Sequence, residues 1–398
     1  MSTVIEYTDP VEGARGWLVY DATDCRLAAG GCRVQRGLTA QTLVALAGRM
    51  TLKERLLRIN VDGAKCGLDY DPASPAKEGV LGRFIGFLAG ELRGRLSLGC
   101  DMGTRWPELE QLAARQGVPS VKYAIKSAQE LSHDDFMTRI GLLSAPVGQL
   151  SLGERRAGHA LAQVAIAAAR AAGLREPVTC ALQGFGNLGR AAACSLIADR
   201  VRLVAIADEY GCAADPRCLD VARMLGAAPG VPAHAAAAVP GRPSADVFAV
   251  PADMLVLAAT EDALTDEQAA ALQSPVVVVG ANCGLRPAAE QLLHDRGILV
   301  ISDFIGGIGG SASMEVLFGA GRLPDPPAVL RRLTLMMRDL VGDLTESAAR
   351  HRAQVRDIAL AIAAQPSPDA GGRPYGGSPY LRNLPSMTHA SLPVAAVG

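Results

Sequence analysis

The sequence predicts an α/β protein of two domains, one of them built on a doubly wound parallel sheet. The chain has 398 residues, more than a single hydrophobic core usually organises. Between residues 178 and 301, short apolar segments alternate with helical segments, which is typical of repeated β-α-β units. The glycine-rich segment GFGNLG follows the first apolar segment and precedes a helix. These features predict a parallel sheet with helices on both faces in the second half of the chain.

The first half of the chain predicts a separate domain of mixed strands and helices. Alternation in GWLVYDA and a pair of glycines indicate strands and turns within residues 1–35. Apolar residues recur every three to four positions over 39–58, which predicts a helix, and a second amphipathic helix is expected over 79–92. Residues 60–68 are punctuated by glycines and are expected to be a loop or a strand.

In the second half, the short apolar segments predict strands and the longer segments between and after them predict helices. The expected strands are 178–183, 201–207, 254–257, 276–279 and 298–301, and the expected helices include 156–172, 190–199 and 328–364. Residues 365–398 are rich in proline, glycine and serine, which predicts a disordered tail. The predicted domains are therefore 1–148, with the helices of 328–364 packing back on it, and 149–327.

Composition excludes several classes of partner. A net charge of −1 with 20% charged residues gives no reason to expect nucleic acid or an acidic membrane surface. No apolar run approaches the roughly 20 residues of a membrane span, and the first residues lack the order of a signal peptide. Nine cysteines without a CxxC pair indicate reduced thiols in a cytoplasm and no metal site.

GFGNLG is the fingerprint of a dinucleotide-binding loop. Gly184 permits a tight turn, Gly186 lets the backbone approach a pyrophosphate, and Gly189 lets helix and strand pack closely. Asn187 and Leu188 complete the loop, where the pyrophosphate would meet the positive end of the following helix. This loop predicts a Rossmann-type domain for the second half of the chain.

An acidic residue lies where such a domain needs one. Asp208 ends the next predicted strand, about 20 residues after the glycines, and is placed to bond the adenosine ribose hydroxyls. Its charge would repel a 2′-phosphate, and the residues after it offer no obvious cation. NAD is therefore predicted as the cofactor in preference to NADP.

Lysines are scarce, which draws attention to each of them. Of 39 basic residues only five are lysines, and arginine, unlike lysine, does not lose its proton when buried. Lys53 ends a predicted helix, and Lys65 follows 12 residues later between glycines, in DGAKCG. If the two amines share a pocket, each depresses the pKa of the other, so that one can move protons and the other can bind a carboxylate. For Lys77, Lys122 and Lys126, chance composition remains an open interpretation.

Through the order of its motifs, the chain resembles the family of amino acid dehydrogenases that act on glutamate, leucine, phenylalanine and valine. Within that family it resembles a non-glutamate member more closely. The matching segments are AGGCR (29–33), LAGRMTLK (46–53), DGAKCGLDYDP (62–72), CDMGT (100–104), GFGNLG (184–189), AIADEYG (205–211), GANCGLRPAAEQLLHDRGILVISDF (280–304) and GGIGG (306–310). The resemblance implies a substrate domain, an NAD-binding domain and a homo-oligomer. It also implies reversible oxidative deamination of an L-amino acid to a 2-oxo acid.

The resemblance also implies roles for individual residues. Lys53 would hold the substrate α-carboxylate, Lys65 would be the catalytic amine of low pKa, and Asp101 would assist proton transfer. Gly31 and Asn282 would contact substrate, and Asn282 together with Ala259 would contact the cofactor.

Two departures from the family pattern bear on the substrate. The glutamate enzymes carry a lysine before the glycine pair, where this chain has Ala29, so the second carboxylate of glutamate would be left unpaired. Gly99 is a second small residue at the same pocket. The lack of a lysine at position 29 predicts a non-acidic substrate, and the two small residues predict a bulky or aromatic side chain.

Other departures leave the reaction itself open. Asp62 stands where the family has glycine, and its carboxylate either pairs with an amine or points to solvent, the favoured alternative. A threonine is replaced within 154–158, Gly307 replaces an asparagine, and 311–316 is shortened. An imine reductase that uses another amine, or a silent dinucleotide-binding subunit, therefore remains an alternative, although the retention of Lys53, Lys65 and Asp101 argues against silence.

Overall fold

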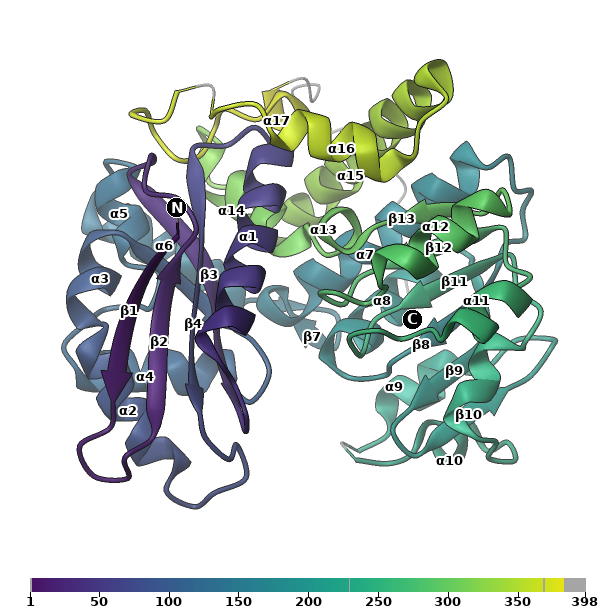
Figure 1. Cartoon of the computed structure of the whole chain (residues 1–398), viewed down its shortest axis with the longest axis horizontal. Coiled ribbons are helices and arrows are strands. Elements are labelled where there is room, and N and C mark those ends of the chain that lie inside the picture. The colour runs from purple at the N-terminus through teal and green to yellow at the C-terminus, as the bar shows by residue number, and fades with distance from the viewer. Residues whose placement is uncertain (1, 229, 368, 383–398) are drawn as a thin grey trace. The chain divides into compact units, whose positions relative to one another are not determined.

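The computed structural model describes residues 2–228, 230–367 and 369–382 and divides them into two compact units (Figure 1). Unit 1 contains residues 2–141, 318–321 and 360–379, and unit 2 contains 142–317, 322–359 and 380–382. Within the described residues, no helix combines the length and the apolar character that crossing a membrane requires.

Unit 1 is built on a five-stranded mixed sheet with the strand order β1-β2-β4-β3-β5. The strands are β1 (Thr3–Thr8), β2 (Arg15–Tyr20), β3 (Leu27–Gln35), β4 (Val61–Asp69) and β5 (Leu96–Cys100). β1, β2 and β4 pair antiparallel, whereas β4, β3 and β5 pair parallel. The segment expected to be a loop or a strand is thus β4, near the centre of the sheet.

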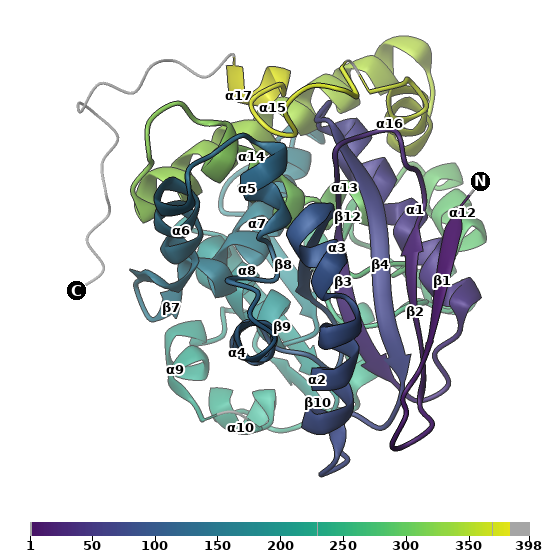
Figure 2. The same cartoon turned by 90° about the vertical axis from the view of Figure 1, so that its left-hand side faces the viewer.

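Helices cover both faces of this sheet. They are α1 (Ala40–Leu56), α2 (Lys77–Phe87), α3 (Ala89–Gly94), α4 (Trp106–Arg115), α5 (Ala124–Ala128) and α6 (His133–Gly141). Leu43 and Ala47 of α1 pack on Trp17 and Val19 of β2. The opposite face carries the larger core, to which α2 and α4 contribute (Figure 2). Because side chains alternate along a strand, each strand residue belongs to one of these two faces.

Unit 2 contains a six-stranded sheet in the order β10-β9-β8-β11-β12-β13. The strands are β8 (Thr179–Gln183), β9 (Arg202–Asp208), β10 (Gly211–Ala214), β11 (Met254–Leu257), β12 (Val276–Val279) and β13 (Leu299–Ile301). Only the edge strand β10 pairs antiparallel. The strand order reverses direction between β8 and β11, which is where ligands bind in doubly wound sheets. The predicted doubly wound α/β fold is confirmed.

The remaining elements of unit 2 are mostly helical. They are α7 (Leu152–Ala171), α8 (Asn187–Ala198), α9 (Val221–Gly226), α10 (Ala233–Ala237), α11 (Asp266–Ala271), α12 (Pro287–Asp295), α13 (Asp303–Gly306), α14 (Gly309–Gly319), α15 (Pro326–His351), α16 (Val355–Ala363) and α17 (Pro379–Arg382), with a short β6 (Pro146–Val147) and β7 (Leu150–Ser151) pair. Ala269 of α11 and Ala289 and Leu293 of α12 join alternate residues of the sheet strands in one core. Along the chain, α14, α16 and α17 each begin in one unit and end in the other.

The last fifth of the chain is distributed between the units differently from the expectation. Residues 322–359 belong to unit 2, because α15 packs on α7, where Nε2 of His159 lies 3.0 Å from the carbonyl oxygen of Leu330 and 2.9 Å from Oγ1 of Thr334. Residues 360–379 return to unit 1. Part of the expected tail is therefore packed structure, and the rest of it, 383–398, lies outside the described residues.

Asn60 and Gln129 hold this returning segment. Asn60 donates from Nδ2 to the carbonyl oxygen of Arg373 at 2.9 Å and accepts from Oγ of Ser367 at 2.6 Å. Gln129 donates to the carbonyl oxygen of Tyr375 and accepts from its backbone amide, both at 3.0 Å. Amide side chains suit this task, because each offers both donors and acceptors to a passing backbone.

Candidate active site

A buried ion-pair cluster lies on the α1 face of the unit 1 sheet. Nζ of Lys65, on β4, is 2.6 Å from Oδ2 of Asp101, and Nε of Arg33, on β3, is 3.1 Å from the same oxygen. Lys65 is 4% exposed and Arg33 3%, so both cations are almost fully removed from water. Two of the residues expected to carry the chemistry, Lys65 and Asp101, are therefore in direct contact.

The CDMGT motif fixes the position of Asp101. The chain turns directly after β5, and Gly103 takes a φ of +73°, a conformation that suits glycine. A Cβ at Gly103 would also lie 2.1 Å from the carbonyl oxygen of Val34. Oγ1 of Thr104 accepts from the backbone amide of Asp101 at 3.0 Å and donates to the carbonyl oxygen of Cys32 at 2.8 Å. The turn is thus tied to β3, beside Lys65.

Asp101 is held in its ionised form. Burial raises the pKa of its carboxyl group, but the charges of Lys65 and Arg33 outweigh burial, so that the pKa falls from 3.8 to about 2. The carboxylate is consequently a hydrogen-bond acceptor at any pH near neutrality. The cation that shares Asp101 with Lys65 is Arg33, whereas the sequence suggested that the second cation of the pocket would be Lys53.

Glycine at position 31 leaves space beside the reactive groups. A Cβ on Gly31 would lie 3.2 Å from Nζ of Lys65 and 3.2 Å from Cβ of Asp101. Both contacts are tighter than a side chain normally accepts, so alanine here would press on the ion pair. Gly31 therefore keeps the approach to Lys65 open.

Lys53 lies on α1, which packs on the same face of the sheet. A Cβ on Gly63 would be 2.3 Å from the backbone nitrogen of Thr51, so helix and strand touch backbone to backbone at this point. Lys53, two residues further along α1, is 5% exposed. A lysine is almost never this buried unless it is paired. Helix α1 thus brings a second buried lysine to the face that holds Lys65.

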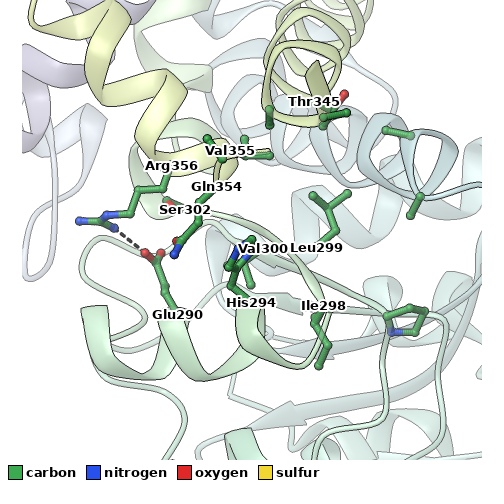
Figure 3. Close-up of a pocket in the computed structure, with 17 residues that line it drawn as sticks. Glu290, His294, Ile298, Leu299, Val300, Ser302, Thr345, Gln354, Val355 and Arg356 are labelled. Carbon is green, nitrogen blue, oxygen red and sulfur yellow. Dashed lines mark hydrogen bonds and ion pairs between the residues drawn. The ribbon is translucent and has the colours of Figure 1, made fainter. Parts of the chain in front are cut away.

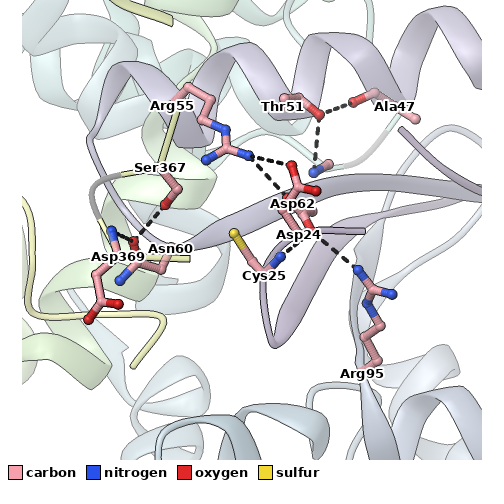
Figure 4. Close-up of polar contacts among 11 residues, drawn as sticks. Asp24, Cys25, Ala47, Thr51, Arg55, Asn60, Asp62, Arg95, Ser367 and Asp369 are labelled. Atoms are coloured by element: carbon pink, nitrogen blue, oxygen red, sulfur yellow. Dashed lines mark hydrogen bonds and ion pairs between the residues drawn. The ribbon is translucent and has the colours of Figure 1, made fainter. Parts of the chain in front are cut away.

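Asp62 differs from both sequence-based alternatives, because it neither meets an active-site amine nor points to solvent. It is fully buried, and its carboxylate pairs with Arg55 at 3.3 Å and with Arg95 at 3.2 Å (Figure 4). Oδ2 also accepts the backbone amide of Cys25 at 2.7 Å. Asp62 and Lys65 are three residues apart in a strand, and side chains at odd separations point to opposite faces. Asp62 is therefore a structural ion-pair centre.

Ala29 and Gly99 lie near one another on β3 and β5. In the parallel register Ala29 pairs with Ser97 and Gly31 pairs with Gly99, so these four residues face the same side of the sheet. A Cβ on Gly99 would lie 3.5 Å from the carbonyl oxygen of Gly30, an ordinary contact. The predicted substrate-binding residues Ala29, Gly31 and Gly99 therefore lie on one surface, next to Lys65.

In unit 2, the glycine loop has the geometry that its sequence predicts. Gly184 has a φ of +100°, and a Cβ there would lie 2.6 Å from Cβ of Ala259. A Cβ on Gly189 would lie 1.9 Å from the carbonyl oxygen of Gly184, so helix α8 packs closely on the turn. A Cβ on Gly186, in contrast, would meet nothing within 4 Å. The backbone at Gly186, the N-cap of α8, is therefore open to a ligand, which fits a pyrophosphate.

Asp208 ends β9 and is engaged by backbone amides. Oδ1 accepts from Tyr210 at 2.9 Å and Gly211 at 3.0 Å, and Oδ2 accepts from Ala233 at 2.6 Å. A carboxylate offers about four acceptor sites, so these bonds leave roughly one for a ribose hydroxyl. Arg190 of α8 stacks on Phe185 and donates to backbone carbonyl groups, so it is committed to the fold.

The remaining predicted cofactor residues follow the carboxyl ends of the parallel strands. Asn187 and Leu188 begin α8, Ala259 follows β11 and Asn282 follows β12. The turn at Asn282 is held by its neighbour Cys283, whose backbone amide donates to Oδ2 of Asp303 at 2.8 Å. Gly184, Gly186, Gly189, Asp208, Ala259 and Asn282 thus share one edge of the sheet.

Two of the departures from the family pattern are connected in the structure. Arg156, within the ERRAG segment of α7, donates to the carbonyl oxygen of Gly310 at 2.9 Å and contacts Oγ of Ser313. Arginine in one segment therefore bonds the shortened segment 311–316, and Gly307 ends the short helix α13 just before it. Arg156 therefore ties α7 to the first turns of α14 within unit 2.

A cavity of about 390 Å³ lies elsewhere in unit 2, between α12, β13, α15 and α16 (Figure 3). Its buried carboxylate, Glu290, pairs with Arg356 at 2.5 Å, and burial raises the pKa of Glu290. None of the predicted site residues lines this cavity. Among the described residues, no group of three or more histidine, cysteine or acidic residues could hold a metal ion.

Family models match both halves of the chain. Residues 151–370 match the model described as Glutamate/Leucine/Phenylalanine/Valine dehydrogenase, and residues 2–115 match that of the Glu/Leu/Phe/Val dehydrogenase dimerisation domain. The chain belongs to this dehydrogenase family. The resemblance inferred from the motifs is thereby confirmed.

Individual family members that resemble the chain are glutamate dehydrogenases. The Aeropyrum pernix enzyme is 27% identical over 286 residues, 71% of this chain and 66% of that protein. The NADP-specific glutamate dehydrogenase A1 of Halobacterium salinarum is 28% identical over 288 residues, also 71% and 66%. An NAD-specific glutamate dehydrogenase of Staphylococcus aureus is 31% identical over 129 residues, 32% of this chain and 31% of that protein. The match thus spans slightly less than two thirds of the first two relatives.

Solved structures of the family share the fold. The hetero-hexameric glutamate dehydrogenase of Thermus thermophilus, in a leucine-bound form, has a TM-score of 0.73 and 27% identity, covering 91% of this chain and 87% of that chain. The glutamate dehydrogenase of Peptoniphilus asaccharolyticus has a TM-score of 0.66 at 20% identity, covering 91% and 88%.

Two residues that lie beside the predicted site residues are absent from the sequence-based prediction. Arg33 belongs to the AGGCR motif that supported the family resemblance, so the sequence could have suggested it. Its membership of the ion-pair cluster is evident only from its contact with Asp101. Lys122 lies outside every matching motif, yet its ammonium group lies 4.0 Å from where a Cβ on Gly99 would be. Its only signals were the scarcity of lysines and its position after β5.

Proposed function

We propose that this family member catalyses the reversible oxidative deamination of an L-amino acid, with Lys65 and Asp101 as its proton-transfer pair. The observation that carries the proposal is the 2.6 Å contact between these groups, buried and flanked by Gly31. Lys65 would exchange a proton with water and with the reacting amino group, and Asp101 would take or supply that proton along the short hydrogen bond. Arg33 would keep the Asp101 carboxylate in place as the proton moves.

The second part of the proposal concerns the cofactor. The loop of Gly184, Gly186 and Gly189 would hold the pyrophosphate, and Asp208 would bond the adenosine ribose. When bound, the nicotinamide would accept hydride from the substrate α-carbon. We infer NAD in preference to NADP, because the Asp208 carboxylate disfavours a 2′-phosphate, although relatives of both kinds are known by name.

The third part concerns the substrate. Lys53, buried on the same face as Lys65, would bind the α-carboxylate. Ala29, Gly31 and Gly99 present no side chain larger than a methyl group beside Lys65, which supports a substrate with a large side chain. The expectation that this side chain is non-acidic rests on the lack of a cation at position 29 alone. The match of residues 2–115 to a dimerisation domain supports an oligomer.

The test is turnover with NAD⁺ and a panel of L-amino acids, followed by NADH absorbance. Lys65→Ala is expected to lower kcat/KM by roughly 10³-fold or more, because general acid–base groups contribute about 10²–10⁴-fold. NADH binding should persist in that variant. Lys126→Ala, which removes a partly exposed lysine of the same unit, is the matched control and should keep full activity. An unchanged rate in Lys65→Ala would remove Lys65 from the mechanism.

The two alternative functions, an imine reductase and a silent dinucleotide-binding subunit, predict different results in assays with NADH. An imine reductase would consume NADH with a 2-oxo acid only when a larger amine replaces ammonia. A silent subunit would bind NADH without any turnover. The intact ion pair of Lys65 and Asp101 supports an active enzyme, because a buried charge pair costs desolvation energy that a silent subunit has no need to bear.

A further inference from the structure

Lys122 is a buried lysine outside the motifs that the chain shares with its family. It lies between β5 and α5 and is 5% exposed. Its Nζ is 3.5 Å from Oγ of Ser97 and 5.7 Å from the centre of the Trp106 ring. Three of the five lysines of the chain, Lys53, Lys65 and Lys122, are therefore 5% exposed or less in one unit.

The strand register places this ammonium group on the active-site face. Ser97 and Gly99 pair with Ala29 and Gly31 and share their face, on which Lys65 also lies. Nζ of Lys122 is 4.0 Å from the Cβ position of Gly99, and Nζ of Lys65 is 3.2 Å from that of Gly31. With neighbouring strands about 5 Å apart, the two ammonium groups are separated by no more than about 12 Å. The paired glycines Gly31 and Gly99 lie between them on the two strands.

The position of Lys122 supplies a cation near Ala29, where the family's glutamate enzymes have a lysine. Ala29 provides no cation for a substrate side chain, but its strand partner Ser97 is the residue that Lys122 contacts. Burial raises the pKa of the Glu110 carboxyl group, and the nearby charge of Lys122 partly opposes this shift. The carboxylate of Glu110 accepts from Oγ of Ser120 and the backbone amide of Val121. Lys122 thus approaches Ala29 and Gly31 from the side of β5, the strand that pairs with β3.

We propose that Lys122 determines substrate specificity, and that its ammonium group binds a carboxylate at the end of the substrate side chain. The proposal rests on the proposed deamination and reverses one expectation from the sequence, that the lack of a lysine at position 29 excludes acidic substrates. Lys53 would bind the α-carboxylate, Lys122 the distal carboxylate, and the glycines Gly31 and Gly99 would leave room for the carbon chain between them. Trp106 and Ser97 position Lys122.

The test compares L-glutamate with L-glutamine, its neutral isostere, and with L-norleucine. The wild type should prefer L-glutamate, and Lys122→Met should lower kcat/KM for L-glutamate about 100-fold, mainly through KM, because a charged hydrogen bond is lost. The kcat/KM for L-norleucine should change by less than about threefold, because this substrate has no distal carboxylate and its other contacts are unchanged. Lys122→Arg should retain the preference for L-glutamate, and Lys126→Met serves as the control.

Three outcomes would contradict the proposal. An equal loss of activity on all three substrates in Lys122→Met would make Lys122 a structural residue only. Turnover of L-norleucine but not of L-glutamate by the wild type would overturn the acidic specificity and leave the deamination intact. No turnover of any L-amino acid would overturn the proposed function itself.

If Lys122→Met does not fold, the wild type provides a second measurement. Binding of 2-oxoglutarate in the presence of NADH should change the fluorescence of Trp106, whose ring lies beside Lys122, and Trp106→Phe should remove that change. 2-Oxohexanoate, which lacks the distal carboxylate, should not produce the change. An equal response to both acids would also contradict the assignment.

Discussion

Gly30 and Gly31 are neighbours in β3, yet a methyl group should have different consequences at the two positions. A Cβ on Gly30 would lie 1.8 Å from the carbonyl oxygen of Ala64, which is backbone of the paired strand β4. A Cβ on Gly31 would meet Asp101 and Lys65 at 3.2 Å instead. We therefore expect Gly30→Ala to impair folding, and Gly31→Ala to fold but to lose about 100-fold in kcat/KM, because small displacements of catalytic groups are costly. Thermal unfolding and NADH formation measure the two effects separately.

The contrast between the two variants is the internal control. A Gly31→Ala protein that is as active as the wild type would show that the space beside Lys65 is not needed. A Gly30→Ala protein with unchanged thermal stability would show that the strands can separate locally.

At the residue scale, sequence motifs identified most groups of the site but not their contacts. Lys65 and Asp101 could be named because their motifs are distinctive, and the structure brings them to 2.6 Å. The environment of Asp62 could not be foreseen, because its partners Arg55 and Arg95 come from other elements of unit 1. Which face of a strand a residue occupies depends on register, and register is set by pairing across the sheet.

At the scale of elements, His159 joins three helices of unit 2. Its Nδ1 lies 3.0 Å from Oγ of Ser195 on α8, and its Nε2 contacts Leu330 and Thr334 on α15. Burial, together with the charge of Arg155, lowers the pKa of His159 from 6.5 to about 4. The unfolded chain therefore binds a proton below about pH 6.5 that the folded chain does not bind until about pH 4. Stability from this group is complete above pH 6.5 and is lost as the pH falls toward 4.

This difference predicts the pH dependence of unfolding. Between pH 7.5 and pH 5 the wild type should lose about 2 kcal/mol through His159, an order-of-magnitude figure from the cited pKa values. His159→Gln should be less stable at pH 7.5 but should lack this part of the decline. Urea unfolding at the two pH values measures it, with His351→Gln, an exposed histidine of α15, as the control. Equal declines in wild type and His159→Gln would contradict the assignment.

Most elements were predictable because their apolar residues repeat with the period of a helix or a strand. The five strands predicted for unit 2 agree with the structure within one residue, whereas the edge strand β10 and the short β6–β7 pair were not predicted. The segment that forms β4 could be predicted only as a loop or a strand, because glycine is unfavourable in strands. Its glycines allow close contacts with other elements, which the local sequence does not reveal. A Cβ on Gly67, for example, would lie 2.4 Å from the carbonyl oxygen of Arg33. The unit to which 322–359 belongs depended on tertiary packing and could not be derived from periodicity.

At the scale of the whole molecule, unit 1 is assembled from three separate parts of the chain. A chain ending at Ala359 lacks the segment held by Asn60 and Gln129, and loses at least four hydrogen bonds within unit 1. We expect unit 1 to lose about 4 kcal/mol of stability, at roughly 1 kcal/mol for each bond. Both tryptophans, Trp17 and Trp106, lie in unit 1, so their fluorescence reports its unfolding in urea.

Unit 2 should respond differently to the same truncation. Its described residues up to 359 are retained, so NADH binding, if the proposed cofactor site is correct, should be unchanged. A chain ending at Arg382 is the matched control for removal of C-terminal residues. Equal tryptophan unfolding curves for the chains ending at 359 and 382 would show that the returning segment contributes little.

The returning segment also determines the order in which the protein can be completed during synthesis. The ribosome produces the first 141 residues of unit 1 early, but residues 360–379 emerge only after nearly all of unit 2 has been made. Domains generally fold as units while the chain is still being synthesised. Unit 2 can therefore close first, whereas the sheet that carries Lys65 has to wait, with Asn60 and Gln129 unoccupied, until residues 360–379 have been made. The proposed catalytic unit is thus begun before unit 2 and completed after it.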